Sequence, residues 1–134
     1  MMRLGKEGAQ VHIDLGLALR DAGDLEGAIR NFQRALTLDP SLPSAWTKLG
    51  IAYKDKDCHG CRTKAVDALQ RATRVNPKDA VAHYELGYMF KDDGRRKEAI
   101  AEFRRYLDLR PDAGDAASVQ DDIYYMQEES RRVP

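Results

Sequence analysis

Apolar residues recur along the chain at the spacing of amphipathic α-helices, and the same arrangement occurs three times. The segments HIDLGLAL, WTKLGIAY and HYELGYMF each place a ring residue, a Leu-Gly pair and a large apolar residue at matching positions. Each segment is followed by an amphipathic stretch that ends in proline: AIRNFQRALTLDP, AVDALQRATRVNP and AIAEFRRYLDLRP. Apolar positions three and four residues apart lie on one face of a helix. The pattern therefore predicts three consecutive helix–turn–helix units.

The three units follow one another at nearly constant spacing. The leucine of the Leu-Gly pair recurs at Leu15, Leu49 and Leu86, which are 34 and 37 residues apart. Between the two helices of the first unit lies a Gly-Asp pair, and proline follows the second helix, so both boundaries carry ordinary turn residues. Small residues such as Gly16 and Ala28 are expected where the two helices of a unit approach closely.

This pattern resembles the tetratricopeptide repeat, a unit of 34 residues with the motif W-x2-L-G-x2-Y, then A-x3-F and then P. The second unit supplies the first half of the motif as Trp46, Leu49, Gly50 and Tyr53. The other two units supply its second half as Ala28, Phe32, Pro40, Ala99, Phe103 and Pro111. The resemblance implies an all-α, right-handed solenoid of three repeats. It divides the chain into an N-terminal tail (1–8), a first repeat (9–42), a second repeat with three extra residues in its turn (43–79), a third repeat (80–113) and a C-terminal capping helix with a tail (114–134).

The chain departs from the family motif at three places. His12 and His83 stand where the motif has tryptophan. Leu69 replaces the aromatic residue in the second helix of the second unit. Tyr106 occupies a position where the family has a small alanine, so the second helix of the third unit has to accommodate a larger side chain.

The segment after the third unit lacks a Leu-Gly pair but retains helical periodicity. Its apolar residues at helical spacing are Ala116, Val119, Ile123 and Met126. We expect a single capping helix here, because the terminal unit of a solenoid would otherwise expose its apolar face.

Composition and charge argue against several functional classes. Lys and Arg together number 22 and so do Asp and Glu, so no net charge attracts nucleic acid or an acidic membrane. No apolar run is long enough to span a bilayer, and the first ten residues lack the apolar core of a secretory signal. We therefore expect a cytoplasmic protein with reduced cysteines. No phosphate-binding loop or nucleophile–base pair is present, so we predict no catalytic residue, no cofactor and no metal.

The two cysteines lie in the turn of the second unit, in the segment CHGC. Two thiolates and at most one histidine leave a four-coordinate zinc site incomplete, and the contexts of haem attachment and thioredoxin-like motifs are also incomplete. Cys61 is expected near a helix N-terminus beside Arg62 and Lys64, which favours a thiolate. An ordinary elaborated loop is the first interpretation, and a redox-sensitive pair or a metal site formed by Cys58 and Cys61 are the alternatives.

On the first helix of each unit, the residues beside the face that carries the Leu-Gly pair form a neighbouring strip, called the arc below. This arc is apolar enough to bind a partner. Its residues are Gln10, Ile13, Leu17 and Arg20 in the first unit, Ser44, Thr47, Ile51 and Lys54 in the second, and Val81, Tyr84, Tyr88 and Lys91 in the third. In tetratricopeptide families this arc lines the concave groove in which peptides or helices dock, so the resemblance implies a partner-binding groove here. The alternatives are that neighbouring first helices or the chain's own tail cover the arc.

The resemblance and the absence of catalytic motifs together predict a non-enzymatic adaptor or scaffold. Its partner is expected to be a peptide or helix of another protein, with an apolar anchor and nearby acidic residues, and neither nucleic acid nor membrane. One subfamily binds acidic chaperone C-termini through a carboxylate clamp. The matching positions here are Ile13, Leu17, Lys48, Val81 and Glu85, and only Lys48 is basic. The alternatives are a self-associating scaffold, as a weak homo-oligomer, and a module that responds to redox state or metal through its two cysteines.

Overall fold

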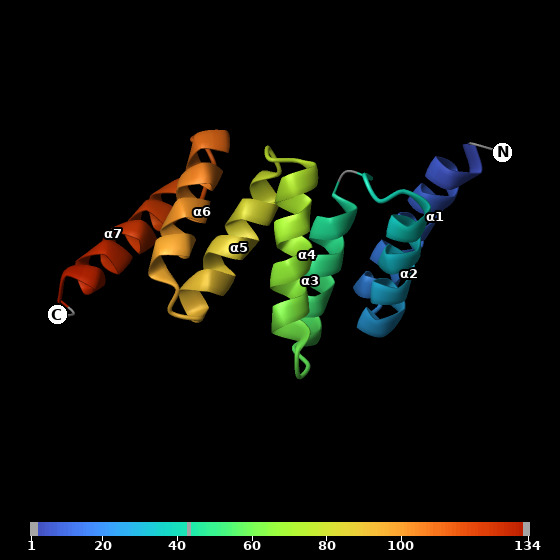
Figure 1. Ribbon diagram of the computed structural model, residues 1–134, viewed down its shortest axis with the longest axis horizontal. Helices are drawn as coiled ribbons and strands as arrows, with labels where there is room; N and C mark the ends of the chain where they lie inside the picture. The colour runs from blue at the N-terminus through green and yellow to red at the C-terminus, as the bar shows by residue number, and fades with distance from the viewer. Residues whose placement is uncertain (1–2, 43, 133–134) are drawn as a thin grey trace. The chain divides into compact units, whose positions relative to one another are not determined.

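The computed structural model describes residues 3–42 and 44–132, and in this range the chain consists of α-helices joined by short turns (Figure 1). These residues form the helices α1 (Arg3–Asp21), α2 (Leu25–Leu38), α3 (Ala45–Lys56), α4 (Cys61–Val75), α5 (Ala80–Asp92), α6 (Arg96–Leu109) and α7 (Ala116–Arg132). No strand occurs among the described residues. The order of three helix pairs followed by one further helix is the one that the repeat pattern predicts.

The helices divide into two compact units, and the boundary lies between Pro77 and Lys78. Unit 1 contains the pairs α1/α2 and α3/α4, and within it α2 also packs against α3. Unit 2 contains α5, α6 and α7, and α6 packs against both of its neighbours. Each unit therefore has its own set of helix–helix contacts.

The Leu-Gly motif places a glycine where the two helices of a pair touch. A β-carbon on Gly16 would lie 2.5 Å from the ring of Phe32, and one on Gly50 would lie 2.7 Å from Cγ of Leu69. Phe32 and Leu69 are themselves fully buried, and each such side chain contributes about 1.5–3 kcal/mol to folding. Any larger residue at the glycine would push the second helix away from the first.

The N-terminal part of α1 differs from the sequence-based prediction. The segment that we expected to be a tail over residues 1–8 is helical from Arg3 onward. A β-carbon on Gly8 would lie 3.3 Å from the side chain of Leu38, so this early turn of α1 lies against the end of α2. Helix formation there extends the contact between the paired helices, which a motif that starts at the ring residue does not predict.

The leucine of the Leu-Gly pair is not buried in every repeat. Leu49 is only 4% exposed, whereas Leu15 at the equivalent position of the first repeat is 47% exposed. Leu49 belongs to a core that also contains residues of α2, the second helix of the preceding repeat. In the described part of the chain no helix precedes α1, so Leu15 lacks such a cover. The shared position in the Leu-Gly pair therefore does not by itself bury the leucine.

The three extra residues of the second repeat are shared among two helices and the turn. Helix α3 continues six residues beyond Gly50, whereas α1 and α5 continue five residues beyond their equivalent glycines. The turn before Cys61 has four residues where the other two repeats have three, and α4 begins one residue earlier relative to Ala65. The expectation that the turn contains all three residues is therefore wrong, because a longer helix satisfies more backbone hydrogen bonds than a longer loop.

Helix α7 caps the third repeat as predicted. Val119, Ile123 and Met126 are buried, and Ala116 is half-buried. Tyr106 of α6 is also buried, and its hydroxyl donates a hydrogen bond of 2.7 Å to Asp115, just before α7. The large side chain at this position is accommodated because its polar end has a partner in the turn that leads to the cap.

The two histidines that replace tryptophan occupy the same structural position and have polar partners. Nδ1 of His12 lies 3.0 Å from Oδ1 of Asn31, and Nδ1 of His83 lies 2.6 Å from Oε2 of Glu102. His83 is buried, and a buried polar group without a partner would destabilise the fold. Both histidines are therefore explained by packing.

Candidate functional site

In unit 1, the apolar part of the predicted groove is partly surface and partly core. Ile13 and Thr47 are each only 4% exposed, so neither side chain offers a surface to a partner. Leu17 of α1 and Ile51 of α3, at equivalent positions of the two repeats, are half-buried. The accessible apolar surface of this arc is therefore smaller than the sequence predicts, and it consists mainly of Leu17 and Ile51.

The polar positions of the same arc carry contacts within unit 1. Nε2 of Gln10 donates to Oδ1 of Asp14 at 3.0 Å. Nη2 of Arg20 lies 3.2 Å from Oδ2 of Asp55 on α3, and both side chains are about one-third exposed. Such an exposed pair contributes about 0–1 kcal/mol, so an incoming carboxylate can replace Asp55 at small cost. Lys54 is exposed on the same helix as Asp55.

In unit 2, the chain's own capping helix contacts two of the predicted groove residues. The hydroxyl of Tyr88 donates to Oδ2 of Asp122 at 2.9 Å, and Nζ of Lys91 donates to Oδ1 of the same carboxylate at 3.0 Å. Both contacts run from α5 to α7. The alternative in which the tail covers the arc therefore holds for these two side chains.

The rings of unit 2 form a packed aromatic cluster around α5 and α6. The ring centroid of Tyr84 lies 4.9 Å from that of Tyr88 and 5.0 Å from that of Tyr106. The ring centroids of Tyr88 and Phe103 are also 4.9 Å apart. Burial and the neighbouring Asp122 raise the pKa of Tyr88 well above its usual value of 10. The hydrogen bond to the carboxylate before α7 and burial raise the pKa of Tyr106 to about 12. Both hydroxyls therefore stay protonated donors at neutral pH.

A cavity of about 810 Å³ lies among α2, α3 and α4 of unit 1. It is lined by Gln33, Leu36, Thr37, Trp46, Leu49, Tyr53, Thr63, Lys64, Asp67, Ala68 and Arg71. Cζ of Arg71 lies over the ring of Trp46, 5.2 Å from the ring centroid. Nζ of Lys64 lies over the ring of Tyr53, 5.7 Å from its centroid. The motif assigns both rings to packing and does not predict this cavity. The small Ala68, at the position that Asn31 holds in the first repeat, is the signal that could have indicated open space beside Trp46.

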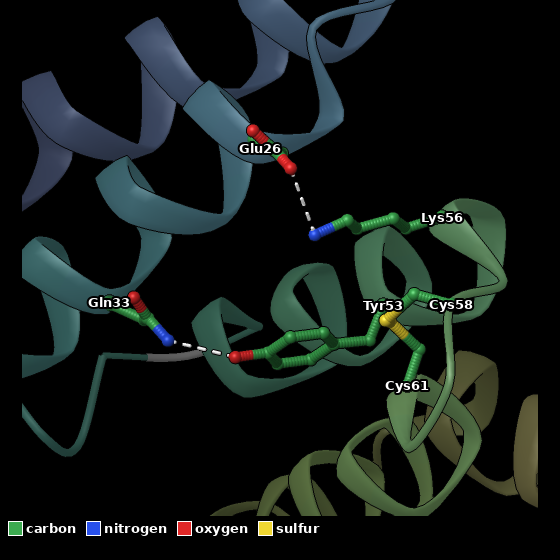
Figure 2. The surroundings of a disulfide bond; sticks show 6 residues. All are labelled: Glu26, Gln33, Tyr53, Lys56, Cys58 and Cys61. Atoms are coloured by element: carbon green, nitrogen blue, oxygen red, sulfur yellow. Dashed lines mark hydrogen bonds and ion pairs between the residues drawn. A yellow bond between two sulfur atoms is a disulfide. The ribbon is translucent and has the colours of Figure 1, made fainter.

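Cys58 and Cys61 form a disulfide, with their Cα atoms 4.9 Å apart (Figure 2). This differs from the expectation that the cysteines are reduced in an ordinary loop. Cys58 is exposed in the turn, whereas Cys61 is buried as the first residue of α4. In the described part of the chain, no group of three or more His, Cys, Asp and Glu residues is placed to hold a metal ion. Among the same residues, no helix is both long enough and apolar enough to cross a membrane.

Two family models match the chain. One, described as "TPR repeat", matches residues 16–57, and the other, described as "Tetratricopeptide repeat", matches residues 60–116. Superkiller protein 3 of Schizosaccharomyces pombe is 31% identical over 99 residues, which cover 74% of this chain and 7% of that protein. The peroxisomal targeting signal receptor of Saccharomyces cerevisiae is 33% identical over 75 residues, which cover 56% of this chain and 11% of the receptor. The chain thus spans a small part of the length of either relative.

A solved structure shows the same fold. The first TPR domain of Spaghetti (RPAP3), bound to the HSP90 peptide SRMEEVD, aligns with a TM-score of 0.81 at 18% identity, covering 94% of this chain and 95% of that chain. At this identity the likeness establishes the fold alone. It agrees with the three helix pairs, the buried motif residues and the two matching family models. The chain therefore belongs to the tetratricopeptide repeat family and has the all-α solenoid fold of that family.

Proposed function

We propose that the chain is a non-enzymatic adaptor or scaffold that binds a short peptide or helical segment of another protein. Membership of the tetratricopeptide repeat family supports a role as a protein-interaction module. One protein with the same fold was solved with a bound HSP90 peptide, and one relative is named as the receptor of a targeting signal. One name describes a bound peptide and the other a receptor of a signal, and the proposal extends recognition of this kind to the present chain.

The proposed binding surface is the unit 1 face, defined as Gln10, Leu17, Arg20, Ile51 and Lys54. The observation that carries it is the half-buried pair Leu17 and Ile51, each followed three residues later by a cation on the same helix. An apolar side chain of the partner can bury the exposed part of the two aliphatic residues. A carboxylate beside that anchor can pair with Arg20 or Lys54. Such a pair fixes the orientation of the bound segment and raises the rate of association. The proposed ligand therefore has an apolar anchor with acidic residues nearby.

Recognition of an acidic chaperone C-terminus is not part of this proposal. The clamp positions of that subfamily hold Ile13, which is buried, and Leu17, Val81 and Glu85, none of which is basic. Only Lys48 is basic, and its Nζ donates to Oγ of Ser44 at 2.8 Å. A terminal carboxylate would therefore lack the set of cations that the clamp supplies.

A displayed library of short peptides, selected against the intact chain, tests the proposed function. Leu17→Ala is the test variant, and Leu15→Ala is the matched control, because residues two apart on a helix point to opposite sides. We expect the selected peptides to share an apolar anchor with acidic neighbours. The affinity of the best peptide should fall about tenfold in Leu17→Ala, which corresponds to about 1.4 kcal/mol, and stay unchanged in the control. Equal affinities for both variants would place the binding surface elsewhere.

A second candidate function, self-association, is favoured by an exposed apolar strip on α1. Val11 is 62% exposed and Leu15 is 47% exposed, and four residues apart they lie on one side of the helix. Light scattering after size-exclusion chromatography should then show a mass that rises with concentration. Replacing both residues by lysine should return the mass to that of a monomer. A monomer mass for the unchanged chain at all concentrations would eliminate this candidate.

A further inference from the structure

The α3–α4 turn that carries the two cysteines has backbone features that support it in addition to the disulfide. The amide of Cys61 donates to the carbonyl oxygen of Cys58 at 3.0 Å. Asp57 and Gly60 adopt positive φ angles of 51° and 79°, which reverse the chain over four residues. This hydrogen bond and these backbone angles do not involve the sulfur atoms, so they favour the same turn when the S–S bond is open. The disulfide can therefore open and close with little rearrangement of the flanking helices.

The two sulfur atoms differ in exposure, which gives the bond a direction of attack. A thiolate attacks a disulfide along the S–S axis, from the side opposite to the leaving sulfur. Cys58 lies in the exposed turn, whereas Cys61 is only 1% exposed. An external thiolate can therefore reach Sγ of Cys58, and Sγ of Cys61 is the leaving group.

The first turn of α4 is suited to a thiolate at Cys61. Backbone amides at a helix N-terminus and nearby cations stabilise a thiolate. The first turns of α2 and α6 each contain an acidic residue, Glu26 and Glu98, whereas that of α4 contains none. In its place α4 has Arg62 and Lys64 directly after the cysteine. Of the three second helices, α4 is thus the one that starts with a cysteine and has no acidic residue in its first turn.

We propose that Cys58 and Cys61 form a reversible thiol–disulfide exchange site whose substrates are dithiols and disulfides. In the reducing direction, one thiolate of a dithiol attacks Sγ of Cys58 and forms a mixed disulfide, and the S–S electron pair leaves with Sγ of Cys61, which takes up a proton. The second thiolate of the dithiol then attacks the other dithiol sulfur, the one bonded to Cys58, and releases the Cys58 thiolate, which takes up the second proton that the dithiol loses. The dithiol becomes a disulfide and loses two electrons, and the chain gains both as two thiols.

In the oxidising direction the same two residues exchange their positions in the reaction. The thiolate of Cys58 attacks an external disulfide and forms a mixed disulfide, which releases one external thiol. Cys61 then attacks Sγ of Cys58, closes the intramolecular bond and releases the second external thiol. Cys58 is thus the exchanging residue and Cys61 the resolving residue. This site lies outside the unit 1 face and does not depend on the proposed binding function.

Glutathione disulfide is the probe that distinguishes the two cysteines. The reduced intact chain and its Cys58→Ser and Cys61→Ser variants are treated with it, and adducts are followed by mass spectrometry. We expect the unchanged chain to recover its intramolecular disulfide without a lasting adduct, and Cys61→Ser to accumulate the adduct at Cys58. The buried cysteine of Cys58→Ser should react at least about tenfold more slowly. Equal rates for the two variants, or a lasting adduct on the unchanged chain, would overturn the proposal.

A second measurement uses the unchanged chain, so it holds even if a serine variant does not fold. The reduced chain is labelled briefly with iodoacetamide, and the labelled residue is identified by peptide mapping. We expect label at Cys58 before Cys61 in the native chain, and equal labelling once the chain is denatured. Labelling of Cys61 first, or of both at one rate in the native chain, contradicts the proposed order.

Discussion

Units 1 and 2 use equivalent positions of their first helices in different ways. In unit 1, Arg20 of α1 pairs with Asp55 on the next first helix, and both side chains are about one-third exposed. In unit 2, Lys91 of α5 pairs with Asp122 of α7, which is 21% exposed and also accepts a hydrogen bond from Tyr88. Helix α7 thus supplies the contacts of a following first helix. Breaking the arc's contacts therefore requires little free energy in unit 1 and more in unit 2. A partner is expected on unit 1.

The largest effect is expected from removing the capping helix. Deleting residues 114–134 removes the buried side chains of Val119, Ile123 and Met126, each worth about 1.5–3 kcal/mol. Their sum is comparable to the total stability of a typical domain, about 5–15 kcal/mol. We expect aggregation or a large drop in the melting temperature. A truncated chain as soluble and as heat-stable as the complete one would show that α7 contributes little to unit 2.

The two acidic residues of the comparison can be tested by the same substitution. Asp122→Ala removes two contacts and leaves the Tyr88 hydroxyl without its acceptor, which should cost about 1–3 kcal/mol. Asp55→Ala breaks one exposed ion pair and should cost about 0–1 kcal/mol. The free energy of unfolding, measured in urea, checks both values. Equal losses of unfolding free energy would mean that Asp122 of α7 stabilises the contact with α5 no more than Asp55 of α3 stabilises the contact with α1.

High pH should weaken unit 2 through its tyrosine hydroxyls. The pKa of Tyr106 is raised from 10 to about 12 in the folded chain, so its contribution to stability is complete below pH 10. Between pH 10 and pH 12 the unfolded chain releases this proton and the folded chain keeps it, so stability falls as the pH rises. The urea midpoint of the unchanged chain should therefore drop more from pH 8 to pH 11 than that of Tyr106→Phe. Equal drops in the two proteins would remove this link.

The smallest effect is expected from the cations of the unit 1 face. Replacing Arg20 and Lys54 together by alanine should weaken binding of a selected peptide less than Leu17→Ala does. Exposed charges at the rim of an interface act mainly on the rate of association, so binding should also become less sensitive to salt. Isothermal titration at low and high ionic strength measures both effects. A salt dependence equal to that of the unchanged chain would mean that the peptide's acidic residues do not meet these cations.

The repeat motif predicts the helix pairs and much of the core because its residues make local contacts within one pair. Gly16 against Phe32 and Gly50 against Leu69 are such contacts, and each joins two helices that follow one another. The exposure of Leu15 depends on what lies before the first repeat, which the motif does not contain. Local pattern therefore determines the pairing of helices and leaves the end of the array undetermined.

The candidate site could be predicted only in part, because its exposure depends on contacts between repeats. Tyr88 and Asp122 are 34 residues apart, one repeat length, and this spacing is the signal that α7 stacks where a further first helix would lie. The cavity beside Trp46 is lined on α4 by Ala68, where the first repeat has the larger Asn31, and the family pattern treats this as an ordinary packing position. The disulfide depends on how the extra residues of the second repeat divide between helix and turn, and sequence periodicity does not specify that division.

Mapping a selected peptide onto the methyl groups of the chain by NMR tests the central claim most directly. A peptide that binds the unit 1 face should shift the methyl signals of Leu17 and Ile51. The signals of Val119 and Ile123, buried on α7, should stay in place and serve as the internal control. Shifts confined to α7, or to Leu36 and Leu49 beside the cavity, would contradict the claim that the exposed first-helix arc of unit 1 is the binding surface.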